Sequence, residues 1–132
     1  MNVNFTVFID KILSGEKRQT IRRASPKWEN VKVGDKLTLY TGLRTKQCRK
    51  LGEAVVESIT PIILNTAENW VAVNTPLGCF YLDTADQYDL LRRDGFGTQQ
   101  EFYLFFIEHY KLPQNAMVVI RWTDFKEAKD ER

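Results

Sequence analysis

The chain contains 132 residues with a mass of 15.4 kDa, 43% of them hydrophobic, and its formal net charge is +2. This composition argues against disorder and predicts one domain, residues 1–132, with a core of about residues 3–125 and a charged tail, residues 126–132, that frays. The longest apolar runs are about six residues, whereas a membrane span needs about 18, and the amino terminus lacks a secretory signal pattern. Two cysteines form neither a disulfide framework nor a metal quartet. We therefore expect a reduced, cytoplasmic protein that does not bind a membrane.

The first half of the chain predicts one helix followed by strands. Apolar residues recur at helical spacing over residues 3–14, and Gly15 can cap the end of that helix. Residues 17–23 favour a strand. Three further strands are expected over residues 36–40, 51–64 and 70–73. Pro61 lies within the second of these and requires a strand edge or a break.

The second half predicts two helices and a last strand. Asp83 or Thr84 can cap a helix that runs to about residue 92, and Thr98 can cap another, with Glu101 completing a capping box. A strand follows over residues 116–122. This order of elements predicts the α+β class, as a small mixed β-barrel with helices packed on it.

Charge is distributed unevenly along the chain. Residues 1–50 contain twelve Lys or Arg and four acidic residues, whereas residues 51–132 contain seven and thirteen. A basic surface attracts anions such as nucleic acid, but the halves of a sequence are not the faces of a fold. The pattern leaves two interpretations open, a basic binding surface and a mixed solvated surface.

The residues that can carry chemistry concentrate between Gly15 and Arg22. Strand alternation places Thr20 and Arg22 on one face, and Lys17 can fold back over Thr20 if it lies in the turn after Gly15. A Lys, a Thr hydroxyl and an Arg that converge can bind a phosphate or a carbonyl oxygen, or can activate the hydroxyl. Burial or the cations Arg18 and Arg22 would lower the pKa of Lys17 and make it a useful base. The same pattern also fits a plain basic strand at the surface.

This stretch resembles the signature of the ASCH domain, a PUA-like fold, on the residues Gly15, Lys17, Thr20, Ile21 and Arg22. The resemblance covers most of residues 5–122 and continues in the family's order with Val33-Gly34-Asp35, Asp94-Gly95-Phe96 and Glu101-Phe102. It implies a PUA-like small mixed β-barrel of five to six strands with flanking helices and a cleft between them.

The resemblance also implies a function. The wider fold is associated with RNA and modified nucleosides, and small bacterial ASCH proteins include amidohydrolases that remove the acetyl group from N(4)-acetylcytidine. A ribonuclease activity also occurs in the family. The amidohydrolase trio of Lys, Thr and Glu falls here on Lys17, Thr20 and Asp94, and the last is one methylene shorter than the family residue. Considered without the resemblance, Asp94 also fits an ordinary helix exit.

Further candidate binding residues lie in two predicted loops. The loop of residues 42–50 has no acidic residue, and its Arg44, Lys46 and Arg49 suit a phosphate backbone beside a stacked base. A solvated hairpin tip fits this loop equally well. Trp28 is a candidate stacking residue or lid over the cleft.

The expected function is binding of RNA or a modified nucleoside in a basic cleft lined by Lys17, Thr20, Arg22 and Asp94. The first alternative is an amidohydrolase that acts on N(4)-acylated cytidine, and the second is a ribonuclease. We expect no cofactor and no metal, because Cys48, Cys79 and the single histidine, His109, lack the short spacings of metal ligands. His109 is expected at a helix end. The sequence does not predict an oligomeric state.

Overall fold

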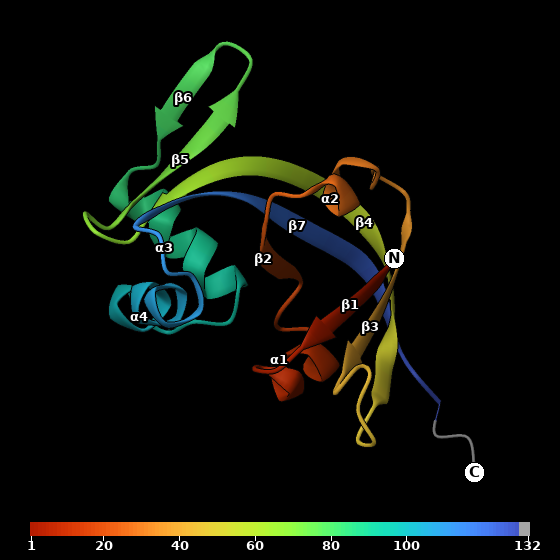
Figure 1. Cartoon of the computed structure of the whole chain (residues 1–132). Helices are drawn as coiled ribbons and strands as arrows, with labels where there is room; N and C mark the ends of the chain where they lie inside the picture. The colour runs from red at the N-terminus through yellow and green to blue at the C-terminus, as the bar shows by residue number, and fades with distance from the viewer. Residues whose placement is uncertain (130–132) are drawn as a thin grey trace.

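The computed structural model describes residues 1–129 as four helices and a seven-stranded sheet (Figure 1). The strands are β1 (Asn2–Phe5), β2 (Gln19–Arg23), β3 (Lys36–Thr41), β4 (Arg49–Asn65), β5 (Trp70–Thr75), β6 (Gly78–Tyr81) and β7 (Gln114–Glu127). The helices are α1 (Ile9–Ser14), α2 (Pro26–Glu29), α3 (Thr84–Arg93) and α4 (Gln99–His109). This mixture confirms the predicted α+β class. None of these helices is long and apolar enough to cross a membrane.

Two long antiparallel strands, β4 and β7, form the centre of the sheet. On the far side of β7 lies β2, while the first half of β4 pairs with β3, which pairs in parallel with β1. The second half of β4 pairs with β5 and then β6, which extend as an arm (Figure 1). Pro61 lies between the stretches of β4 that pair with β3 and with β5, so its position has a sheet partner on one side only.

The sheet curls at one end but does not close. In the order β2-β7-β4-β3-β1, the outer strands β1 and β2 have no ladder between them. The carbonyl of Asn4 in β1 instead accepts a hydrogen bond from Nη2 of Arg22 in β2, at 2.7 Å. The predicted barrel of five to six strands is therefore not confirmed. The sheet has seven strands and an open seam between β1 and β2, which we call the β1–β2 seam.

The amino-terminal segment differs from its sequence prediction. A strand occupies residues 2–5 and α1 begins only at Ile9, so the helix predicted over residues 3–14 is wrong in its first half. Val3 and Phe5 are buried and alternate with asparagines, which is the period of a strand, and pairing with β3 holds them in place. Gly15 ends α1 in the left-handed conformation, as predicted.

Most of the later elements lie where the sequence predicts them. The two N-caps are confirmed, because Asp83 accepts from the N–H of Asp86 and Thr98 from the N–H of Glu101. The capping box is not formed, since the Glu101 carboxylate accepts from the N–H of Gly97 and not from that of Thr98. The sequence did not predict β6 or α2, and β7 is longer than expected because it pairs with β4 along most of its length. The tail was expected to fray from residue 126, but Lys126 and Glu127 belong to β7 and pair with Glu53 and Gly52 of β4. Residues 130–132 lie outside the described residues.

The sheet separates two hydrophobic cores. Ile120 and Trp122 of β7 lie in the core inside the curl, together with β1 and β3, whereas Val119 lies in the core beneath α3 and α4. Because β2 pairs with β7, its residues alternate in the same way: Thr20 stands opposite Ile120 and Ile21 opposite Val119. The strand β2 therefore presents one face to the curl and the other to the helices.

Candidate functional site

A cavity of about 200 Å³ opens at the β1–β2 seam. Its polar lining includes Lys17, Thr20, Arg22 and Asp94, the four residues that the sequence suggested for one cleft. Its apolar lining is mostly aromatic and comes from both cores: Phe5, Phe8, Phe96, Phe105, Phe106 and Tyr110. The structure thus brings the four polar residues together, and their roles in binding or catalysis stay predictions.

Lys17 enters the cavity from the turn that follows α1. After Gly15, the backbone N–H of Lys17 donates to the carbonyl of Lys11 at 2.9 Å, which directs the side chain inward, where it is 3% exposed. Its ammonium lies 5.5 Å from the centre of the Phe8 ring and 5.9 Å from that of Phe5. Cation–π attraction therefore partly replaces the water that this ammonium loses.

Asp94 supplies the counter-charge of Lys17. The ammonium nitrogen lies 3.5 Å from Oδ2 of Asp94 and donates to the backbone carbonyl of the same residue at 2.5 Å. Burial lowers the pKa of Lys17 despite the opposing effect of Asp94, and burial raises the pKa of Asp94 despite the opposing effect of Lys17. The neutral amine of Lys17 is therefore easier to reach than that of an exposed lysine, and a general base requires this state.

Two neighbours hold Asp94 in position. It caps the carboxyl end of α3, where its N–H donates to the carbonyl of Leu90, and its Oδ1 accepts from Nε2 of Gln19 at 3.2 Å. Gln19 is almost fully buried, and its Oε1 accepts from Nε of Arg121 at 3.0 Å. Since the Arg121 donor fixes the acceptor end of the amide, the NH₂ end faces Asp94. Sequence reasoning missed Gln19, although a polar residue on the same strand face as Ile21 was a signal.

Thr20 and Arg22 share one face of β2, as strand alternation predicts. Nε of Arg22 donates to Oγ1 of Thr20 at 2.9 Å, and its guanidinium lies 4.9 Å from the centre of the Phe5 ring. Thr20 is buried, so this charge-assisted bond acts in a medium that screens it weakly. The bond would stabilise negative charge that develops on the threonine oxygen.

The aromatic wall of the cavity depends on a close contact between Phe8 and the turn after α3. Phe8 has a φ of 61°, a left-handed conformation that is strained for an aromatic residue, and its ring lies 5.0 Å from that of Phe96, nearly perpendicular to it. Gly95 lies against the same ring and has a φ of 110°. Lys11 donates to the carbonyl of Gly95 at 2.6 Å and fixes the turn from the other side.

His109 also lines the cavity, where it is exposed at the end of α4. Its ring stacks on Phe105 at 4.0 Å between centres, and its Nδ1 lies 2.7 Å from the Phe105 carbonyl. The helix-end position was predicted. Its place at the cavity follows from the packing of α4 beside the seam, which no local pattern reveals.

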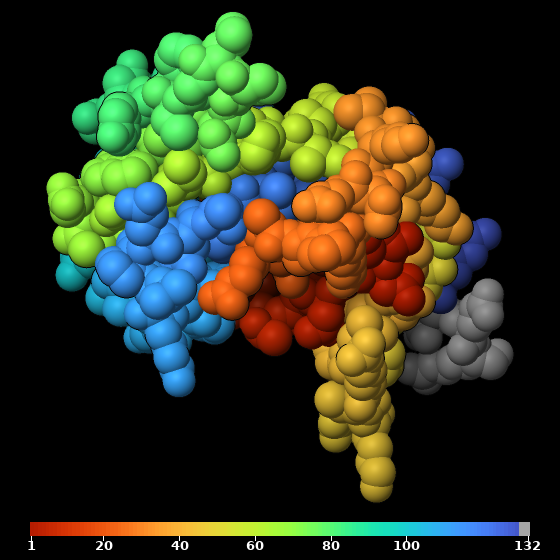
Figure 2. All heavy atoms as spheres, turned by 45° about the horizontal axis from the view of Figure 1, so that its top comes forward, coloured from red at the N-terminus to blue at the C-terminus, as the bar shows by residue number. Residues whose placement is uncertain are grey.

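The remaining candidate binding residues lie outside the cavity. Trp28 is 6% exposed and packs in the core inside the curl, because α2 turns its ring inward, so it is neither a lid nor an accessible stacking residue. Arg44 and Lys46 are exposed on the β3–β4 loop, and the exposed Arg49 is the first residue of β4, directly after it. This loop projects from the molecule as the gold finger in Figure 2. The base of this loop adjoins the cavity, since Leu43 N–H donates to the side chain of Asn4, a lining residue, at 2.9 Å.

The cavity combines ammonium and guanidinium donors, a carboxylate acceptor, a hydroxyl and aromatic faces. Such a set can hold a planar polar ring, and it can also support nucleophilic attack by a hydroxyl beside a base. Within residues 1–129, no three His, Cys, Asp or Glu residues gather in a way that could hold a metal ion.

Neither protein-family models nor the sequences of curated proteins match this chain. Two solved structures resemble it, both of the ASCH protein from Zymomonas mobilis. A tyrosine-to-phenylalanine variant aligns with a TM-score of 0.56 at 15% identity over 96% of this chain and 70% of its own. The other structure aligns with a TM-score of 0.55 at 15% identity over 96% of this chain and 68% of its own. At this level of identity the likeness concerns the fold, and the chain has the fold of an ASCH domain.

Proposed function

We propose that the protein binds a single base of RNA, or a modified nucleoside, in the cavity at the β1–β2 seam. The observation that carries this proposal is the buried Lys17–Asp94 pair beneath an aromatic wall. Aromatic rings stack on the faces of unpaired bases, and side-chain donors and acceptors bind their edges. The pair offers both an N–H donor and a carboxylate acceptor at one place.

The size of the cavity favours one small ring. Drug-sized ligands occupy pockets of about 300–1,000 Å³, and this cavity measures about 200 Å³. A pyrimidine ring such as that of cytosine suits this space. Lys17 or Arg22 can donate to its ring carbonyl, and Asp94 can accept from an exocyclic amine.

The surface beside the cavity suits a chain of phosphates. The β3–β4 loop carries Arg44 and Lys46, Arg49 follows at the start of β4, and the loop begins next to the cavity-lining Asn4. A single-stranded RNA that placed one base in the cavity could therefore lay its backbone along this loop. This arrangement supports RNA as the ligand in addition to a free nucleoside.

A second candidate function is hydrolysis of an acyl group from N(4)-acylated cytidine. The observation in its favour is the bond from Arg22 to Oγ1 of Thr20 in the cavity that also holds Lys17. In this reaction, Oγ1 of Thr20 attacks the acyl carbon while the neutral amine of Lys17 takes its proton. The carbon–nitrogen bond then breaks, cytidine leaves with a proton returned from Lys17, and water hydrolyses the threonine ester to the free carboxylic acid.

In this scheme Asp94 holds and orients Lys17. Its side chain is shorter than a glutamate by one methylene, yet Oδ2 lies 3.5 Å from the Lys17 nitrogen. The position of Asp94 at the cap of α3 compensates for the shorter reach, because the backbone itself approaches Lys17 closely.

Binding is tested by titrating the whole protein with cytidine and with N(4)-acetylcytidine while its backbone amide NMR signals are followed. Saturable shifts are expected around residues 17–22 and 94–96. Thr20→Val should weaken binding by about tenfold, the effect of one lost hydrogen bond in a buried site. Thr123→Val is the matched control, because Thr123 is half-buried on β7 outside the cavity. Shifts elsewhere, or none with either nucleoside, contradict the proposed site.

Hydrolysis is tested on the same proteins by chromatography of N(4)-acetylcytidine and its products. Release of cytidine by the wild-type protein that stops in Thr20→Val and continues in Thr123→Val supports a threonine nucleophile. Turnover that persists in Thr20→Val points to a water molecule activated by Lys17 instead. If no N-acylated cytidine is hydrolysed, binding alone remains, and shortened products from a single-stranded RNA would support the ribonuclease alternative.

A further inference from the structure

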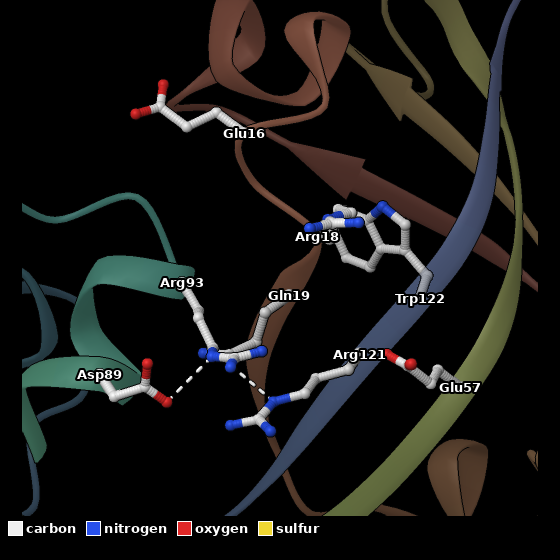
Figure 3. A pocket seen from close by; sticks show the side chains of 8 residues that line it. All are labelled: Glu16, Arg18, Gln19, Glu57, Asp89, Arg93, Arg121 and Trp122. Atoms are coloured by element: carbon white, nitrogen blue, oxygen red, sulfur yellow. Dashed lines mark hydrogen bonds and ion pairs between the residues drawn. The ribbon is translucent and has the colours of Figure 1, made fainter. Parts of the chain in front are cut away.

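A second cavity, of about 400 Å³, lies against the helix-facing side of β2 (Figure 3). Three arginines line it, and they come from three separate segments: Arg18 precedes β2, Arg93 lies in the last turn of α3, and Arg121 belongs to β7. Figure 3 shows the Arg93 and Arg121 side chains close to each other beside Gln19, while Arg18 lies at the Trp122 ring on another side of the cavity. Guanidinium groups gathered in this way repel one another unless an anion lies among them.

Three acidic residues line the same cavity and equal the three arginines in formal charge, but only one of them forms an ion pair there. Asp89 is bound to Nε of Arg93 at 2.9 Å. Glu16 and Glu57 also line the cavity, on opposite sides in Figure 3. Within residues 1–129, neither glutamate lies within ion-pair distance of an arginine. Arg18 and Arg121 therefore face the cavity without a carboxylate partner among the described residues.

Arg121 is held in place by a buried side chain. Its Nε donates to Oε1 of Gln19 at 3.0 Å, and Gln19 is 1% exposed. This bond uses one edge donor of the guanidinium and leaves the two terminal nitrogens for a ligand. A guanidinium fixed in advance loses little conformational entropy when it binds two oxygens of a phosphate in its fork.

We propose that Arg18, Arg93 and Arg121 form a phosphate-binding pocket, which we call the arginine pocket. Its ligand is the phosphate group of a nucleotide or of an RNA backbone, since both present the same anion. Arg121 would bind two phosphate oxygens, and Arg18 and Arg93 would neutralise the remaining charge. The arginine pocket lies apart from the cavity at the β1–β2 seam, and the two share no lining residue.

The test uses the full chain and inorganic phosphate as the first probe, with NMR signals of the arginine Nε–H groups and of the backbone as readout. Phosphate should shift the Arg121 Nε–H signal saturably at constant ionic strength. Arg18→Gln and Arg93→Gln should each weaken binding by about tenfold or more, the usual effect of a lost charge-assisted bond. Arg92→Gln is the matched control, because Arg92 is an exposed neighbour on α3 outside the cavity.

Two further arms identify the source of the phosphate. Tighter binding of cytidine 5′-monophosphate than of inorganic phosphate assigns a nucleotide, whereas tighter binding of a single-stranded oligoribonucleotide than of either assigns RNA. Cytidine without phosphate tests the cavity at the β1–β2 seam alone. A lack of binding at one of the two sites therefore does not imply a lack of binding at the other. Absence of saturable phosphate binding, or equal weakening in Arg92→Gln and Arg93→Gln, overturns the arginine pocket.

Discussion

A Cβ atom added to Gly95 would lie 2.8 Å from Cδ2 of Phe8. Real Cβ contacts are not this short, so either the aromatic ring or the turn after α3 would have to move. Both belong to the cavity at the β1–β2 seam. The absence of a side chain at position 95 is therefore a condition for the shape of the candidate site.

Gly95→Ala should destabilise the protein and disturb the cavity. The positive φ of Gly95 and the contact with Phe8 together should lower the free energy of unfolding by about 2–4 kcal/mol, measured by urea denaturation. Gly34→Ala is the control, because Gly34 also has a positive φ, of 95°, but no atom lies within 4 Å of its added Cβ. Equal losses in the two variants would mean that the contact with Phe8 contributes nothing.

Lys17 and Asp94 should behave as one unit in a double-mutant cycle. Lys17→Met leaves a buried carboxylate without its counter-charge, which costs about 3–5 kcal/mol of unfolding free energy. Adding Asp94→Asn removes that charge and keeps an acceptor for Gln19, so the double variant should be more stable than Lys17→Met alone. Urea denaturation of the wild type and the three variants gives the coupling energy. Additive losses would show that the pair does not interact.

The same pair should make stability depend on pH in two windows. The pKa of Lys17 lies below 10.5 in the folded protein. Between that folded pKa and 10.5 the unfolded chain therefore binds more protons than the folded protein, and the free energy of unfolding rises with pH. The pKa of Asp94 lies above 3.8, so the folded protein binds more protons there. Its stabilising contribution is complete below pH 3.8 and is lost as the pH rises through the folded pKa.

Asp94→Asn should change both windows. The loss of stability above pH 3.8 disappears with the carboxyl group. The rise that belongs to Lys17 should begin at a lower pH, because Asp94 no longer raises the pKa of that lysine. Urea denaturation over a series of pH values measures both effects, and Asp10→Asn, at an exposed position on α1, serves as the control. An Asp94→Asn profile that matches the wild type would contradict the assigned pKa directions.

RNA binding should depend on salt through the β3–β4 loop. Replacing Arg44, Lys46 and Arg49 with Ala should reduce the slope of log affinity against log salt concentration by up to about two, at ~0.7 per phosphate contact on a single strand. Fluorescence anisotropy with a labelled oligoribonucleotide measures this slope. A control with Lys27, Lys32 and Arg92 replaced by Ala removes the same charge elsewhere on the surface. A slope that falls equally in both proteins would assign the effect to net charge.

Local patterns were sufficient for most elements of the fold. Asp83 and Thr98 marked the starts of two helices because capping depends on residues only a few positions apart. The first strand could not be recognised, since Phe5 fits the helical spacing of Phe8 and Ile12 as well as its alternation with Val3. Parallel pairing with β3, more than thirty residues away, decides between them. The open seam likewise depends on which edges of the sheet meet, and no local pattern gives that information.

The candidate site was predictable where it follows the backbone of β2 and unpredictable where it depends on packing. Alternation along β2 was enough to put Thr20 beside Arg22. Asp94 was proposed as a site residue from the family resemblance alone. Its contact with Lys17 depends on how the end of α3 packs against the β1–β2 seam. Trp28 was misplaced because a single turn of helix, α2, is too short to leave a pattern, and that turn carries the ring into the core.

The β1–β2 seam has a consequence for the solubility of the protein. An unpaired strand edge is a template on which strands of other molecules can assemble. At the seam, the two unpaired edges are joined by the bond from the Arg22 side chain to the Asn4 carbonyl, and the aromatic residues of the cavity lie beside them. The cavity thus occupies the place at the seam where another chain would otherwise dock, so for the edges of β1 and β2 the recess and the protection against edge-to-edge aggregation are the same structural feature.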